Sequence, residues 1–77
     1  MENIEIEGLS IPFLSGQKEY SEVLWRDKEW NVKMRETYVL PLNVVSSVWK
    51  FFDYDKEKAI DVFEKLSKQR GFWNILK

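Results

Sequence analysis

Two tryptophans, Trp25 and Trp30, stand on either side of the four charged residues RDKE near the middle of the chain. A four-residue loop built around a type I turn accommodates RDKE without positive φ angles. If residues 20–26 and 29–39 are antiparallel strands joined by this loop, the two indoles face each other across the strand pair. The sequence therefore predicts a β-hairpin centred on a cross-strand tryptophan pair.

In this register, one face of the hairpin is apolar, and the other face pairs side chains that attract each other. Val23 stands opposite Val32 beside the indoles, so this face is apolar and is expected to pack in the core. The other face brings together side chains that attract each other: Arg26 with Glu29, Glu22 with Lys33, and Tyr20 with Arg35. A shift of one residue separates these pairs, which supports the alignment. An exposed aromatic surface that recognises a partner is the alternative for the tryptophans.

The N-terminal segment is predicted to form a further strand over residues 4–13. Apolar and acidic residues alternate from Ile4 to Glu7, which is typical of a strand with one buried side. Gly8 reverses the phase of this alternation, as a glycine bulge does. Pro12 cannot donate a hydrogen bond to a neighbouring strand, so it indicates an edge position. The pattern does not decide which of the other two strands pairs with this one.

Two helices are predicted near the C-terminus from apolar residues at helical spacing. The first covers residues 44–52 and has Asn43 as its N-cap. The second covers residues 56–70 and has Asp55 as its N-cap. Gly71 is placed to end the second helix in the left-handed conformation.

These elements define a single α+β domain over residues 1–77. A small antiparallel sheet of about three strands (4–13, 20–26 and 29–39) packs against two C-terminal helices (44–52 and 56–70). A chain of 77 residues buries a modest core, and this one contains neither cysteine nor histidine, so disulfides and the common zinc sites cannot support it. Its aromatic content of 16% supplies apolar area instead.

Charge and composition argue against several classes of function. The net charge of −1 argues against binding nucleic acid through bulk positive charge. Without histidine, cysteine or a glycine-rich phosphate loop, we expect no catalysis, no cofactor and no metal. The sequence shows neither a signal peptide pattern nor an apolar run long enough to span a bilayer, so we expect a cytoplasmic protein without membrane attachment.

We expect the protein to act by binding another protein or a second copy of itself. Large apolar side chains are left over once the predicted sheet and helix faces are assigned, and exposed aromatics near arginine are typical of interface hot spots. The candidate partner-binding residues are Trp73, Arg70, Phe72, Leu24 and Tyr20. A homodimer would also offset the modest stability of so small a domain. The predicted role is that of a small adaptor or inhibitor, of the kind that mobile genetic elements encode.

The alternative hypothesis is a module that binds nucleic acid. The predicted hairpin combines aromatic residues with the basic residues Arg26, Lys28, Lys33 and Arg35, a mixture suited to single strands. The second predicted helix also carries lysines, but acidic residues lie between them. Since three of the four basic hairpin residues already have cross-strand partners, protein binding is the favoured hypothesis.

Overall fold

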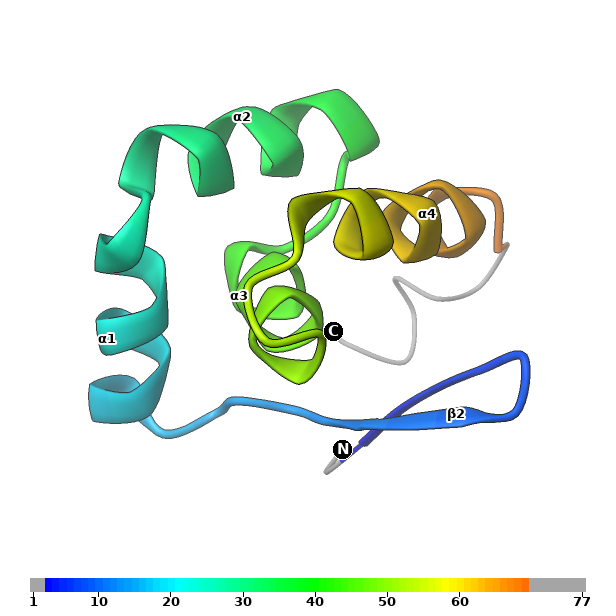
Figure 1. Ribbon diagram of the computed structural model, residues 1–77, viewed down its shortest axis with the longest axis horizontal. Coiled ribbons are helices and arrows are strands. Elements are labelled where there is room, and N and C mark those ends of the chain that lie inside the picture. The colour runs from blue at the N-terminus through cyan, green and yellow to red at the C-terminus, as the bar shows by residue number, and fades with distance from the viewer. Residues whose placement is uncertain (1–2, 70–77) are drawn as a thin grey trace.

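The computed structural model describes residues 3–69 of the chain and has an α+β fold (Figure 1). A two-stranded antiparallel sheet precedes four helices. The elements are β1 (Asn3–Ile6), β2 (Leu9–Pro12), α1 (Gln17–Arg26), α2 (Lys28–Tyr38), α3 (Leu42–Phe51) and α4 (Lys56–Ser67). Helix α3 lies in the middle and contacts α1, α2, α4 and β2. The hairpin lies on the opposite side of the molecule from α2 (Figure 1).

The first two strands form a hairpin, so the predicted single strand over residues 4–13 is wrong. The chain reverses at Glu7 and Gly8, which both have positive φ angles (45° and 80°), as a two-residue type I′ turn requires. The register pairs Ile4 with Ile11, and both side chains are buried. The change at Gly8 from even-numbered to odd-numbered apolar positions therefore marks a turn and not a bulge. Across a two-residue loop, an even-numbered residue of one strand pairs with an odd-numbered residue of the other, so the two side chains lie on the same face.

Helices α1 and α2 replace the predicted strands over residues 20–26 and 29–39, which is the main correction to the predicted fold. The charged stretch RDKE is still a bend, since Asp27 has a non-helical backbone (φ −152°, ψ 77°) that separates the two helices. This stretch has few β-branched residues and many good helix formers. Side chains that face the core recur at helical spacing: Tyr20 and Val23 in α1, and Trp30, Met34 and Tyr38 in α2.

The predicted tryptophan pair does not exist. Trp25 is 64% exposed, whereas Trp30 packs against the core. The Trp30 ring centre lies 5.0 Å from that of Trp49 in α3 and 5.9 Å from that of Phe63 in α4. Trp49 in turn contacts Tyr54 edge to face at 5.0 Å. Trp30 thus joins three helices through ring contacts, each of which stabilises by about 0.5–1.5 kcal/mol beyond its area burial.

Both predicted C-terminal helices are present, with shifted bounds. Asp55 caps α4 as predicted, because its carboxylate accepts a hydrogen bond from the Lys58 backbone N–H at 3.2 Å. Helix α3 starts earlier than predicted, and Asn43 lies inside its first turn instead of capping it. Helix α4 ends at Ser67, not at residue 70. The predicted cap Gly71 lies outside the described residues.

Two buried hydrogen bonds fix the elements around α3. Asn31 in α2 is fully buried, and its side chain accepts a hydrogen bond from the Ser46 hydroxyl at 3.2 Å. On the other side of α3, the Ser47 hydroxyl accepts a hydrogen bond from the Leu14 backbone N–H at 2.8 Å. The Ser47 hydroxyl also donates to the Asn43 carbonyl within its own helix. A single serine therefore anchors the segment between the hairpin and α1 to the central helix.

Replacing Ser47 by alanine should leave the Leu14 N–H buried without an acceptor. We expect Ser47→Ala to lower the free energy of unfolding by about 1–3 kcal/mol. Urea denaturation followed by circular dichroism measures this change. Ser67→Ala is the matched control, because the Ser67 hydroxyl bonds only within α4 at the surface, and it should change stability by less than about 0.5 kcal/mol. Equal effects of the two substitutions would contradict the anchoring role.

Helix α2 ends on a valine in the left-handed conformation. Val39 has φ 54° and ψ 51°, a region that glycine adopts freely and β-branched residues rarely enter. The Leu40 backbone N–H donates to the Arg35 carbonyl at 3.1 Å, which closes a Schellman motif, and the Leu40 side chain is buried. The Val39 side chain, by contrast, is 66% exposed. The conformation costs about 1–2 kcal/mol in a residue other than glycine.

Removing the strain at Val39 should stabilise the folded protein. We expect Val39→Gly to raise the free energy of unfolding by about 0.5–1 kcal/mol, the strain removed less the added freedom of the unfolded chain. Urea denaturation at low micromolar protein concentration tests this. Val32→Gly, the same exchange within α2, should instead lower stability. A loss of stability in Val39→Gly would show that the position is not strained.

Candidate functional site

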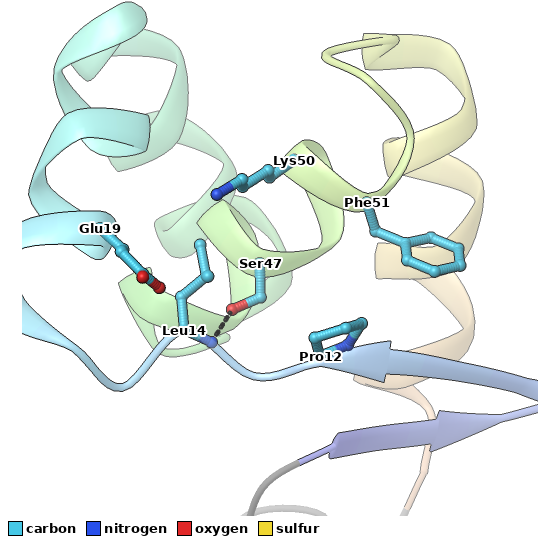
Figure 2. Close-up of a pocket in the computed structure, with 6 residues that line it drawn as sticks. All are labelled: Pro12, Leu14, Glu19, Ser47, Lys50 and Phe51. Atoms are coloured by element: carbon cyan, nitrogen blue, oxygen red, sulfur yellow. Dashed lines mark hydrogen bonds between the residues drawn. The ribbon is translucent and has the colours of Figure 1, made fainter.

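One open pocket of about 370 Å³ lies where α1, α3 and the end of β2 meet (Figure 2). Its lining is mostly apolar, with two charged side chains at the rim. Figure 2 shows Glu19 and Lys50 on one side of the pocket and Pro12 and Phe51 on the other, with Leu14 and Ser47 between them.

The side chains of this pocket offer little for chemistry. The Ser47 hydroxyl is committed to two hydrogen bonds, one accepted from Leu14 and one donated to Asn43, so it is not poised as a nucleophile. Glu19 and Lys50 form no ion pair with each other. Among residues 3–69, no group of three acidic side chains could hold a metal ion. The pocket suits a small apolar group, and the absence of catalysis stays a prediction.

Three basic side chains lie over aromatic rings at the corner where α1, α2 and the start of α4 meet. The pairs are Lys28 over Trp25 (4.4 Å), Arg26 over Tyr54 (4.0 Å) and Lys56 over Trp30 (5.4 Å). Such contacts stabilise by about 0.5–1 kcal/mol at exposed sites. They hold the basic side chains against the protein and leave the broad Trp25 indole at the surface.

Asp27 links the helices at this corner. Its carboxylate accepts a hydrogen bond from the Trp30 backbone N–H at 3.2 Å, which caps α2, and it lies 2.6 Å from the Lys56 ammonium of α4. The hydrogen bond from Lys56, followed by the one from the Trp30 N–H, holds the pKa of Asp27 below its ordinary value of 3.8. One exposed carboxylate therefore both starts α2 and ties it to α4.

The pKa of Asp27 predicts a specific pH dependence. A carboxylate whose pKa is lower in the folded than in the unfolded state contributes stability above its unfolded pKa, and this contribution is lost as pH falls through the folded pKa. We expect Asp27→Asn, which keeps a capping side chain without the charge, to be less stable than wild type at about pH 7, and the gap to be smaller at about pH 2.5. Urea midpoints at both pH values measure the gap. A gap that does not change with pH would contradict the role of the charge.

A second candidate surface runs along the outer side of α2. Two open hollows of about 510 and 260 Å³ lie along the helix, and Glu36 lines both. Val32 is half-buried, and Val39 is exposed. We call this surface the α2 face and define it by Lys28, Glu29, Val32, Arg35, Glu36 and Val39. Trp25 adjoins it through the contact with Lys28.

Two of the predicted partner-binding residues, Tyr20 and Leu24, lie four residues apart on α1. Tyr20 is half-buried against the core, and burial raises the pKa of its phenol, with Arg35 acting in the opposite direction. Leu24 is half-buried on α1. The remaining predicted residues, Trp73, Arg70 and Phe72, lie outside residues 3–69.

The residues predicted for nucleic-acid binding are not gathered on a hairpin. Arg26 and Lys28 lie at the corner on aromatic rings, as described above. Lys33 and Arg35 lie on α2, where each lines a hollow together with Glu36. The predicted cross-strand partners of these residues do not apply, because the strands are helices.

The lysines of α4 are likewise mixed with acidic groups. Lys56 pairs with Asp27. Lys65 lies 2.9 Å from the Glu7 carboxylate of the hairpin and 3.1 Å from Asp61, and these hydrogen bonds raise the pKa of Lys65. Helix α4 therefore does not present a uniform basic face to a phosphate backbone.

The α2 face was missed because its residues were assigned to a strand. Read as a helix, the same sequence repeats every seven positions: Lys28 with Arg35, Glu29 with Glu36, and Val32 with Val39. Residues seven apart lie almost in line on a helix, so this repeat was the signal available in the sequence. The left-handed conformation of Val39 had no sequence signal, since glycine or asparagine is expected there.

Comparison of the chain with protein-family models, with curated proteins and with solved structures finds no match. Function must therefore be argued from the surfaces described above. Over the described part of the chain, every helix is too short or too polar to cross a membrane.

Proposed function

We propose that this domain is a non-catalytic protein-binding module, an adaptor or inhibitor, that binds its partner through Trp25 and the α2 face. The observation that carries the proposal is Val39. This residue adopts a strained left-handed conformation and yet places most of its side chain in solvent. Strained residues that persist in a fold are a reason to look for a function that needs them.

The free-energy balance at Val39 favours a binding role. Glycine would end α2 in the same geometry without strain, and asparagine would do so with less. The valine side chain adds little burial in return, because two thirds of it is exposed. The strained conformation instead places an apolar side chain at a defined position on the surface. An apolar group of a partner can contact it there.

The neighbouring residues fit a protein partner better than a nucleic acid. Tryptophan is among the residue types most enriched at interface hot spots, and the exposed Trp25 lies next to the α2 face through its contact with Lys28. The α2 face alternates basic and acidic residues around its valines, whereas a phosphate backbone favours basic residues alone. Mixed charges around apolar anchors are typical of a protein interface with a polar rim.

Site-specific photo-crosslinking tests this proposal in the cells that encode the chain. A photoreactive p-benzoylphenylalanine in place of Glu36 lies at the centre of the α2 face, because Glu36 lines both hollows. We expect ultraviolet light to give a discrete protein adduct, with the adduct identified by mass spectrometry. Adding Trp25→Ala should remove most of it.

The same photoreactive residue in place of Lys18 is the matched control, since Lys18 is exposed at the opposite end of α1. Equal protein adducts from both positions, or no protein adduct at position 36, would overturn the proposal. A parallel titration with duplex and single-stranded DNA covers the nucleic-acid alternative. Binding that weakens steeply with salt, together with adducts to nucleic acid alone, would favour that alternative instead.

A further inference from the structure

We propose that the partner of the α2 face is a second copy of this chain, and that two α2 helices pair side by side in parallel about a two-fold axis. This inference rests on the proposed function and names its partner. It is carried by the order of charges across the α2 face. We define two rows on this face, a basic row (Lys28 and Arg35) and an acidic row (Glu29 and Glu36), with Val32 between them and Val39 just past the end of the helix.

Helical geometry puts Val32 between the two charged rows. Successive residues turn by about 100° around an α-helix, so residues seven apart lie within about 20° of each other. The basic row therefore lies about 50° to one side of Val32, and the acidic row about 50° to the other. Lys33 lies beyond the acidic row and away from Val32. The face thus carries a positive edge, an apolar centre and a negative edge.

This order makes the face complementary to itself in one orientation only. In a parallel pair the two-fold axis runs along the helices and exchanges left and right, so each basic row meets the acidic row of the other copy. Lys28 then faces Glu29 of the other copy, and Arg35 faces Glu36, as flanking charges do in parallel coiled coils. In an antiparallel pair the axis crosses the helices, and each row meets the same row of the other copy. Like charges then oppose each other.

The position of α2 in the fold allows this pairing. Helix α2 forms one edge of the molecule, and α1, α3 and α4 all lie to the same side of it (Figure 1). A second copy can therefore approach the outer side of α2 without meeting the other helices. The helix has 11 residues, or about 17 Å, so the contact covers about three turns. An interface of this size is small, and we expect a dissociation constant weaker than about 1 µM.

Charge-exchange variants of the full chain test both the partner and the orientation. Arg35→Glu removes a positive group from the basic row, and Glu36→Arg removes a negative group from the acidic row. Each variant alone should self-associate about tenfold more weakly than wild type. An equimolar mixture should recover association, because the added glutamate of one variant faces the added arginine of the other. Sedimentation equilibrium from micromolar to millimolar concentration measures all three.

Lys18→Glu is the matched control, because it makes the same change of charge at the far end of α1, outside the α2 face, and should leave association unchanged. Circular dichroism checks that each variant is folded. If Arg35→Glu is unfolded, Lys28→Glu and Glu29→Lys make the same exchange at the other end of the face. A variant of the basic row that associates more tightly than wild type would indicate an antiparallel pair and overturn the inference, as would a mixture that does not recover.

Two results separate this inference from the proposed function. If the wild-type chain stays monomeric at all concentrations while the crosslinker at position 36 still captures a different protein, the second copy is ruled out and the protein-binding function stands. If position 36 gives no protein adduct, both fail. An adduct at twice the mass of one chain, lost in Arg35→Glu alone and recovered by mixing, supports both.

Discussion

The packing of Trp30 against Trp49 and Phe63 determines which side of α2 faces the core. These rings lie 5.0 and 5.9 Å from Trp30 and belong to α3 and α4, so one indole joins three helices. The buried hydrogen bond between Asn31 and Ser46 fixes the same rotation of α2. Once this side faces inward, the charged rows face outward. The orientation of α2 therefore determines both which residues enter the core and which residues form the proposed binding surface.

The sequence predicts α3 and α4 because each carries its apolar residues at one clear spacing, and Asp55 marks the start of α4. It does not predict α1 and α2, because the stretch around Trp25 satisfies both a strand pairing and a helical pattern. Distant partners decide between them: Trp30 finds its ring contacts in α3 and α4, which no local pattern reveals. The N-terminal hairpin leaves one signal in the sequence, the change of phase at Gly8, and a bulge explains that signal as well as a turn does.

The candidate site was harder to predict than the fold for a related reason. The α2 face becomes visible only when its seven-residue repeat is placed on a helix. Val39 has a second difficulty, because its left-handed conformation follows from the burial of Leu40 just after it and from the hydrogen bond back to Arg35. Local preference argues against valine at this point. Conformations that local preference disfavours are set by tertiary packing, and functional surfaces are where they are most informative.

The junction between α1 and α2 consists of Asp27 alone. The carboxylate of this one residue caps α2 and binds α4, so the link allows little movement between the two helices. The short link therefore restricts how α1, which carries Trp25 in its last turn, can move relative to α2. A molecule that touches the indole and the α2 face would meet them already aligned, so association would cost little ordering of the protein.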